Sequence, residues 1–357
     1  MWGISHRILS IAVASLLIQC LRYAPLVDAT PASSCPAQYG DIPEFVLKYA
    51  PLVYLHSEDP YMPSAFATLL ENSTPTINYT PVANVPSLLT LDNLDSLNSL
   101  GGKDIFLTSK EGIRALPEWF KGTRPDKTGK TVDAVSSVVV VRDHGDGKTV
   151  DAFYFYYFAY NQGNTVIGIQ FGNHVGDWEH NMIRFENGAP QAIWYSQHSA
   201  GQAFTYQATE KQGLRPVGYS SNGSHAVYST PGTHDHTIPG FNLPGGLLED
   251  ETDRGVLWDP LLSAYAYSYD NATELFTPYD ASTPTNYLYF NGRWGDQQLP
   301  DDAEGQIVLF GQRKYVSAPN GVKFKGLVRE EVCPGDGECV IYDEVRVKRG
   351  GVDGGSG

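Results

Sequence analysis

The chain is poor in positive charge. Lys and Arg number 25 against 40 Asp and Glu, which gives a formal net charge of -15 and a pI near 4.9. Nucleic-acid binding requires clustered Lys and Arg side chains that replace counterions on the phosphates, and no such cluster occurs. The composition therefore excludes a nucleic-acid partner. It remains compatible with an acidic lumen, a neutral glycan or a cationic substrate.

Several common catalytic motifs are also missing. The sequence has no Gly-x-Ser-x-Gly nucleophile elbow, no His-Glu-x-x-His zinc motif, no phosphate loop and no dinucleotide fingerprint. These absences exclude the corresponding enzyme families. They leave open whether the protein is an enzyme of another kind.

Long apolar runs are absent after residue 21. Residues 8–21 form an apolar run that is too short for a bilayer span of about 20 residues, and it precedes a small-residue cleavage site at Ala29. We therefore expect residues 1–29 to be a secretory signal peptide, with an uncleaved anchor as the alternative. The mature chain is expected to have no transmembrane segment. We expect residues 30–347 to form a single domain and residues 348–357 a flexible Gly-rich tail.

Cysteine is scarce, with four residues in the whole chain. Once Cys20 leaves with the signal peptide, Cys35, Cys333 and Cys339 remain, which permits one disulfide and one free thiol. A bridge from Cys35 to one of the C-terminal cysteines and a local Cys333–Cys339 bridge both remain open. Four Asn-x-Ser/Thr acceptor sites, which agree with a secreted glycoprotein, lie at Asn72, Asn78, Asn222 and Asn271.

Turn residues and aromatic strand segments are abundant, with 36 Gly, 23 Pro, 22 Tyr and 15 Phe. Residues 136–141 and 150–160 flank a polar turn and predict a β-hairpin, and residues 177–185 and 191–196 predict a second one. Further strands are expected at 216–220, 226–229, 287–290, 306–310 and 340–347. Short helices are expected at 42–49, 64–70 and 93–100. The pattern indicates an all-β, antiparallel β-sandwich with few short helices and long decorated loops. We expect the protein to be a monomer.

The aromatic tract at residues 153–160 has two interpretations. It could form a carbohydrate-stacking platform on the surface. A continuous aromatic run in a central strand more often fills the core of a sandwich. We therefore predict that these side chains are buried.

Residues 174–180, His-Val-Gly-Asp-Trp-Glu-His, form the densest group of ligand-type side chains. Alternate residues of a strand share a face, so Asp177 and Glu179 are expected to point one way, and Trp178 and His180 the other. Carboxylates at i and i+2 lie about 7 Å apart, close enough to share a cation or to divide acid and base roles. Burying two like charges is costly without such compensation. The motif therefore predicts a divalent-cation site.

Four side chains are candidate metal ligands. His174, expected in the loop before the strand, and His198, expected at the end of the next strand, can join Asp177 and Glu179; His225 is the next candidate. Because two of the four ligands supply carboxylate oxygens, the set favours calcium, magnesium or manganese. A third histidine ligand would favour zinc instead. In a catalytic alternative, Asp177 or Glu179 is the general base and His198 or His225 the general acid. A structural, hydrogen-bonded role is an equal alternative for His180, His225, His234 and His236.

Seven stretches between Cys35 and Cys339 form long, specific motifs, at residues 43–61, 100–104, 174–180, 223–226, 230–236, 257–260 and 289–296. Through these motifs the chain resembles the fungal vacuolar protein sorting-associated protein 62 family. The resemblance covers most of the mature chain. It implies a role in delivering proteins to the vacuole, and a location in the vacuolar lumen or outside the cell.

A second resemblance concerns about 40 residues around the 174–180 motif. With the aromatic strand before it and the Tyr-Ser-Gln-His segment after it, the motif is similar to that of necrosis- and ethylene-inducing peptide-like cytolysins. Those secreted β-sandwich proteins bind a divalent cation and recognise plant membrane sphingolipids. The resemblance implies that His174, Asp177, Glu179 and His198 bind the cation here. Gly176 stands where that family has a second histidine.

Three functions fit these observations. The first is a secretory-pathway or vacuolar glycoprotein that binds a divalent cation and a glycan or glycolipid. The second is a metal-assisted hydrolase or lyase acting on a carbohydrate, which an open coordination position or a substrate-sized cleft would favour. The third is a secreted membrane-acting effector like the cytolysins, which an exposed apolar loop beside a closed metal site would favour.

Overall fold

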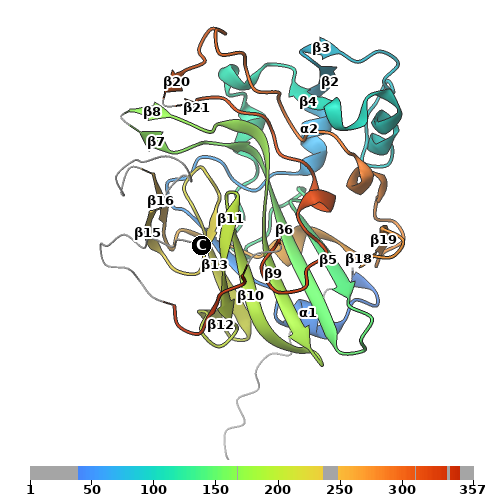
Figure 1. The fold of residues 1–357 in the computed structure, drawn as a ribbon, viewed down its shortest axis with the longest axis vertical. Coiled ribbons are helices and arrows are strands. Elements are labelled where there is room, and N and C mark those ends of the chain that lie inside the picture. The colour runs from blue at the N-terminus through green and yellow to red at the C-terminus, as the bar shows by residue number, and fades with distance from the viewer. Residues whose placement is uncertain (1–38, 167, 236–247, 310, 336–337, 346–357) are drawn as a thin grey trace, which may run out of the picture. The chain divides into compact units, whose positions relative to one another are not determined.

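The computed structural model describes residues 39–345, apart from 167, 236–247, 310 and 336–337. The expectations for the signal peptide, Cys35, His236 and the Gly-rich tail fall outside these residues. The described residues belong to one compact unit. They form strands with few short helices (Figure 1), which confirms the predicted all-β class.

An eight-stranded sheet forms the centre of the fold. Its two central hairpins are the predicted ones, and its pairing is antiparallel except at the β18–β5 and β11–β22 contacts. In sheet order the strands are β19 (Leu275–Pro278), β18 (Ala264–Asp270), β5 (Ser137–Asp143), β6 (Thr149–Asn161), β9 (His174–Glu186), β10 (Ala189–Gln197), β11 (Ala200–Thr205) and β22 (Ile341–Tyr342).

A second, five-stranded sheet packs against the first. Its path is β12 (Lys211–Gln212), β13 (Arg215–Ser220), β1 (Leu52–Leu55) and β17 (Val256–Trp258), with β14 (Val227–Tyr228) also paired to β13. A three-stranded sheet contains β3 (Thr80–Pro81), β2 (Ser73–Ile77) and β4 (Phe106–Ser109). Three short hairpins are β7 (Thr165–Val166) with β8 (Ile169–Gln170), β15 (Gly232–Asp235) with β16 (Glu249–Thr252), and β20 (Val308–Leu309) with β21 (Gln312–Arg313).

The helices are short and lie between the strands. The described α-helices are α1 (Glu44–Lys48) and α2 (Phe66–Asn72). The described 3-10 helices are η2 (Leu94–Leu100), η3 (Gly102–Asp104), η4 (Ile113–Ala115), η5 (Glu118–Lys121), η6 (Pro260–Ser263), η7 (Asn286–Tyr289) and η8 (Val322–Phe324).

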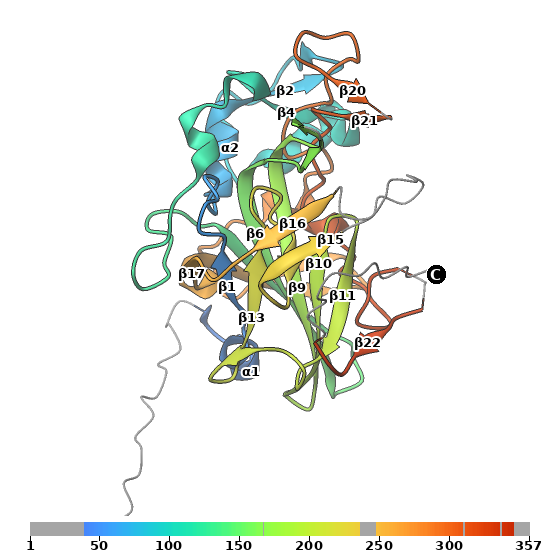
Figure 2. The ribbon, with the colours of Figure 1, turned by 90° about the vertical axis from the view of Figure 1, so that its left-hand side faces the viewer.

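The eight-stranded sheet is covered on both faces. An inner core lies between the two sheets, with β1, β13 and β17 on one side of β9, β10 and β11 (Figure 2). An outer core covers the opposite face with α2, loops and the 3-10 helices η2, η4, η5, η7 and η8. β6 is buried along nearly its whole length because Tyr154 and Tyr156 enter the inner core while Phe153 and Phe155 enter the outer one. The aromatic tract therefore fills the two cores. A strand that is buried on both faces has a continuously apolar sequence.

Two predicted elements have a different form. Residues 287–290, predicted as a strand, lie largely in η7, where Leu288 donates its backbone N–H to the carbonyl of Thr285. Consecutive residues Tyr287 and Leu288 both enter the core, which the two-residue alternation of a half-buried strand does not allow. The helix at 93–100 forms as the 3-10 helix η2.

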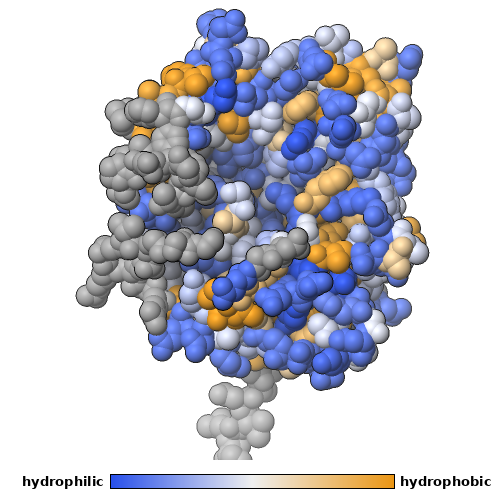
Figure 3. Space-filling model, viewed as in Figure 1, coloured by the Kyte–Doolittle hydropathy of each residue, from blue (hydrophilic) through white to orange (hydrophobic). Residues whose placement is uncertain are grey.

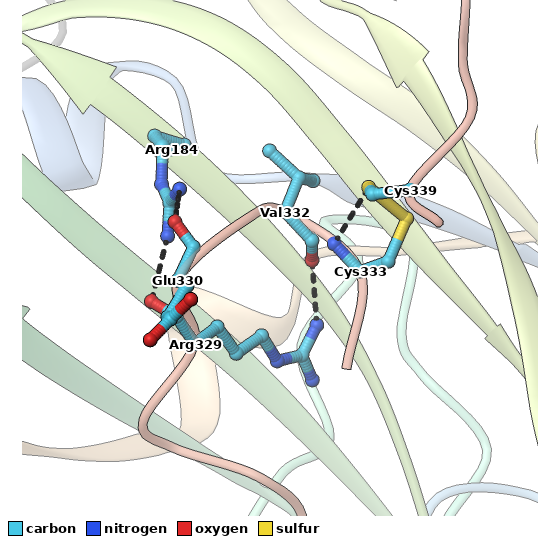
Figure 4. The surroundings of a disulfide bond; sticks show 6 residues. All are labelled: Arg184, Arg329, Glu330, Val332, Cys333 and Cys339. Carbon is cyan, nitrogen blue, oxygen red and sulfur yellow. Dashed lines mark hydrogen bonds between the residues drawn. A yellow bond between two sulfur atoms is a disulfide. The ribbon is translucent and has the colours of Figure 1, made fainter. Parts of the chain in front are cut away.

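The disulfide is the local pairing, Cys333–Cys339. Figure 4 shows how the segment before it is held against the sheet. The Arg184 guanidinium donates to the carbonyl of Glu330 at 2.7 Å, and Arg329 donates to the carbonyl of Val332 at 3.0 Å. The sequence had left this pairing open.

An apolar patch lies on the surface over the β20 hairpin (Figure 3). Ile307 and Val308 contribute to it, with 36% and 40% of their surfaces exposed. Within the described residues, none of the helices combines the length and the apolar composition that a membrane span requires. Among the glycosylation acceptors, Asn78, Asn222 and Asn271 are exposed and Asn72 is half-buried; their glycosylation stays a prediction.

A buried charge network ties β6, β9 and the C-terminal segment together. Asp151 on β6 is fully buried and accepts hydrogen bonds from Arg184 Nε and Nη2, each at 2.8 Å. His144 Nε2 lies 2.8 Å from the same carboxylate. Arg184 also donates to the carbonyls of Arg329 and Glu330. Removal of the carboxylate would leave the guanidinium without its counter-charge.

We expect Asp151→Asn to lower the free energy of unfolding by about 3 kcal/mol, because breaking a buried ion pair leaves an uncompensated charge. Urea denaturation measures this change. The matched control is Asp301→Asn, which removes an exposed bidentate pair with Arg313 at 2.6 and 2.8 Å. That change should cost less than about 1 kcal/mol. Equal losses in the two variants would contradict the assignment.

Candidate functional site

A cavity of about 570 Å³ lies beside the start of β9 and the end of β10. Its wall includes His174, Asp177, Glu179 and His198, so the four predicted ligands line one cavity. His225 is fully buried and contacts Asp177. The four candidate ligands therefore line the cavity, and His225 supports Asp177 from the buried side.

The carboxylates occupy one face of β9, as the alternation predicts. Trp178 belongs to the outer core, and the His180 ring lies 5.2 Å from the ring of Phe155 in that core. Asp177 and Glu179 are only 5% and 6% exposed. His174 is the first residue of β9 and not part of the preceding loop, which corrects that detail of the prediction.

Gly176 allows β9 to pass close to a neighbouring segment. Its φ of +69° lies in the left-handed region, and a Cβ there would come within 1.7 Å of the Trp294 carbonyl oxygen. A larger side chain would require the backbone to move. Packing against the Trp294 carbonyl therefore explains why position 176 requires glycine.

A line of three buried groups ends at the cavity. His225 Nδ1 donates to Asp177 Oδ2 at 3.2 Å, and its Nε2 lies 3.6 Å from Asp59 Oδ2. The His225 ring stacks on Phe158 with centroids 3.7 Å apart and planes 4° apart. Asp59 in turn accepts the backbone N–H of Gly223 at 2.8 Å. Asp177 is thus held in place by His225, which is itself held between the ring of Phe158 and the carboxylate of Asp59.

The environments of the two carboxylates push their pKa values apart. Burial alone would raise the pKa of Asp177, but the hydrogen bond from His225 helps to lower it below its ordinary value. Burial and the charge of Asp177 raise the pKa of Glu179 to about 8. The Ser196 hydroxyl donates to Glu179 Oε2. Asp177 is therefore the carboxylate that stays ionised, and Glu179 the one that holds a proton at neutral pH.

His174 has a defined tautomer. Its Nδ1 lies 2.8 Å from the carbonyl oxygen of Gly176. A carbonyl can only accept, so Nδ1 carries the proton and Nε2 carries the lone pair. Burial lowers the pKa of His174. The neutral ring can therefore act as a ligand through Nε2.

His198 is held by a carboxylate that comes from β16. Its Nε2 lies 2.7 Å from Asp250 Oδ2, and Asp250 also accepts from Ser224 Oγ at 2.7 Å and Tyr228 OH at 2.6 Å. Asn164 donates to the same carboxylate at 3.0 Å. Burial opposes the charged form of His198, but the hydrogen bond and charge of Asp250 prevail and raise its pKa.

Two of the other histidines have structural roles. His180 accepts from Arg329 Nη2 at 2.8 Å on the outer face, and burial together with that positive charge holds its pKa well below the ordinary range. His234 stacks on Tyr228 at 3.8 Å, and its Nε2 lies 3.0 Å from Thr252 Oγ1. Neither faces the candidate ligands, so the hydrogen-bonded alternative holds for both.

Sequence reasoning missed the supporting groups. Asp59 follows β1, far along the chain from Asp177, and Asp250 lies on β16, 52 residues after His198. Lys325, another wall residue, comes from the segment after η8. The available signal for Asp59 was its place in the 43–61 motif, and no comparable signal marked Asp250 or Lys325.

The described residues contain no group of three or more His, Cys, Asp and Glu side chains that is already arranged to hold a metal ion. Each candidate ligand instead has one polar atom engaged by a separate partner, as described above. The four residues share a cavity wall without converging on one point. The metal-site hypothesis therefore depends on reorientation of these side chains around an ion.

Comparisons with known proteins identify the family. The family model for vacuolar protein sorting-associated protein 62 matches residues 144–269, which include His174, Asp177, Glu179, His198 and His225. The vacuolar protein sorting-associated protein TDA6 of Saccharomyces cerevisiae is 36% identical over 329 residues, covering 83% of this chain and 69% of that protein. Vacuolar protein sorting-associated protein 62 of the same yeast is 34% identical over 325 residues, covering 83% and 68%.

Among solved structures, the non-toxic HaNLP3 protein gives a TM-score of 0.28 at 10% identity, covering 62% of this chain and 73% of that one. NLPPya in complex with mannosamine gives 0.25 at 13% identity, covering 61% and 70%. TM-scores this low carry no argument for fold or function. The identity to the two yeast proteins, which extends over most of each chain, shows that this chain belongs to the vacuolar protein sorting-associated protein 62 family.

Proposed function

We propose that this family member binds a divalent cation and a glycan in the cavity beside β9, as part of a role in vacuolar protein sorting. The two yeast relatives are named for vacuolar protein sorting, which supports a role related to that process. The cation and the glycan are inferred from the site itself. The observation that carries them is the pair of buried carboxylates, Asp177 and Glu179, on one face of a strand that lines a cavity.

The charge balance of this pair favours a cation. With a pKa of about 8, Glu179 holds a proton at neutral pH because Asp177 beside it is ionised and both are buried. A divalent cation would replace that proton and remove the repulsion between the carboxylates. Cation binding should therefore release about one proton per site near neutral pH.

The contacts behind the candidate ligands resemble those that orient metal ligands. A ligating histidine commonly donates its second ring N–H to a carbonyl or a carboxylate. His174 donates to the Gly176 carbonyl, and His198 donates to Asp250. Asp177 is likewise fixed through one oxygen by His225. These residues would hold calcium, magnesium or manganese through two carboxylates and two imidazoles.

The remaining cavity wall suits a polyhydroxylated ligand. Side-chain amides, which both donate and accept hydrogen bonds, reach the wall from Asn161, Asn164, Gln197 and Gln312. Calcium accepts six to eight oxygen ligands, so four protein ligands would leave positions for sugar hydroxyls. A volume of about 570 Å³ is within the range of small-ligand sites. A glycolipid would also place apolar atoms against the Val166 and Leu309 side of the wall.

A metal-assisted hydrolase or lyase acting on a carbohydrate is the second candidate. Two carboxylates with separated pKa values are a common arrangement for acid–base chemistry, and His198 has the raised pKa and the Asp250 partner of a general acid. Asp177 would accept a proton and His198 would donate one. Turnover of chromogenic glycosides by the wild type, lost in His198→Asn, would favour this candidate; retained turnover in that variant would exclude His198 as the acid.

We expect Glu179→Gln to weaken manganese binding more than about 100-fold, because loss of a ligand should exceed the 10- to 100-fold cost of losing an outer contact. Isothermal titration calorimetry on the full chain measures the dissociation constant. Glu186→Gln is the matched control, since Glu186 lies at the exposed far end of the same strand. It should bind manganese as the wild type does.

Asp250→Asn provides a graded test of the same site. The substitution keeps the shape of the side chain but weakens its hydrogen bond with His198. The affinity for manganese should therefore fall about 10- to 100-fold. The proposed cation site would be wrong if the wild type bound no calcium, magnesium or manganese. It would also be wrong if Glu179→Gln and Glu186→Gln bound the ion equally well.

The raised pKa of Glu179 also predicts how stability depends on pH in the absence of metal. The carboxyl binds its proton more tightly in the folded state, where its pKa is about 8, than at its ordinary value of 4.5. Its contribution to stability is therefore complete below about pH 4.5 and is lost as the pH rises through about 8. In EDTA, the Tm of the wild type should fall relative to Glu179→Gln between about pH 5 and pH 8. Parallel Tm curves would contradict this assignment.

A further inference from the structure

The cavity wall also contains two positive side chains that form no ion pair. Arg293 and Lys325 line the same cavity as Asp177 and Glu179, and neither has an acidic partner within ion-pair distance in the described part of the chain. Among the described residues, most arginines do have one. Those that pair with a carboxylate are Arg114, Arg142, Arg184, Arg215, Arg254 and Arg313.

Both positive residues are attached to well-fixed backbone. Arg293 donates its N–H to the Ile105 carbonyl at 2.8 Å and accepts from the Leu107 N–H at 3.1 Å. Lys325 follows η8 and donates its N–H to the Val322 carbonyl at 3.1 Å. The backbone at these two positions is therefore held in place, and the two half-buried charges belong to the wall.

A role as counter-charge explains the presence of Lys325. Lys325 lowers the pKa of both Asp177 and Glu179 through its charge, so it compensates the carboxylates from a distance. A half-buried guanidinium in a ligand-sized cavity, without an acidic partner of its own, points to an anionic group on the ligand.

We infer that the cavity binds a polyhydroxylated ligand with an anionic group, such as a sugar phosphate, whose anion contacts Arg293 and Lys325. This inference rests on the proposed function, because it names the ligand class for the same cavity. The planar guanidinium of Arg293 suits two oxygens of a phosphate, and the Lys325 ammonium adds a point charge. The hydroxyls of the ligand meet the amide and carboxylate part of the wall. A phosphate from a soluble sugar and one from an inositol lipid share this chemistry.

The test is calorimetry on the full chain in EDTA, with glucose 6-phosphate, glucose and inorganic phosphate as separate probes. Glucose 6-phosphate should bind at least about tenfold more tightly than glucose, the factor of one charge-assisted contact. Arg293→Gln and Lys325→Gln should each weaken that binding about tenfold or more. Arg293→Lys, which keeps the charge, should lose less than Arg293→Gln.

The matched control is Lys323→Gln. Lys323 lies two residues before Lys325 on η8 but pairs with Glu274 at 2.8 Å, so its replacement should leave glucose 6-phosphate binding unchanged. Thermal melts of every variant check that each one is folded. A lipid source is tested with phosphatidylcholine vesicles that contain phosphatidylinositol. Vesicle binding that requires Arg293 and Lys325, without glucose 6-phosphate binding, would support the anion site and assign it to the lipid.

The inference is overturned if neither glucose 6-phosphate nor the vesicles bind, or if binding is unaffected by Arg293→Gln and Lys325→Gln. If inorganic phosphate bound as tightly as glucose 6-phosphate, the claim that the ligand is polyhydroxylated would also be overturned. Because these titrations contain no metal, they separate the two claims. Anion binding that persists in a protein without cation affinity overturns the proposed cation site alone. Cation binding in a protein that ignores every anion overturns this inference alone.

Discussion

Two carboxyl groups buried two residues apart on β9 determine how the rest of the site is built. Asp177 is stabilised as an anion by His225, which Asp59 supports in turn. Glu179 meets that negative charge and holds a proton at neutral pH, with the Ser196 hydroxyl donating to it. Each compensating group comes from a different segment of the chain. The charge pattern of this strand is therefore compensated by contacts from several distant segments.

The sheet supplies the rigidity that this arrangement needs. β9 lies at the centre of eight strands, with an inner core on one face and an outer core on the other. Gly176 lets the strand pass against the Trp294 carbonyl, which fixes the start of the motif. The cavity opens where this buried strand meets loops and short hairpins. In this member of the vacuolar protein sorting-associated protein 62 family, a rigid strand thus supplies the charged wall of the cavity, and loops surround it.

The sequence predicted those parts of the molecule that depend on local patterns. Residue alternation placed Asp177 and Glu179 on one face of β9, and turn residues located both central hairpins. Aromatic density identified β6 as a core strand. Contacts between distant segments left no local pattern, so Asp59, Asp250 and the choice of the Cys333–Cys339 bridge were not predicted. Residues 287–290 were misassigned because two adjacent side chains of η7 are both buried.

The central claim is that the two carboxylates share a cation. Anomalous diffraction from crystals of this chain soaked in manganese tests it directly. The account predicts a peak in the cavity within about 2.5 Å of one oxygen from each of Asp177 and Glu179, with His174 and His198 turned toward it. Manganese bound elsewhere in the same crystals, with no peak between these carboxylates, would contradict the account and leave a proton as the shared partner of the pair.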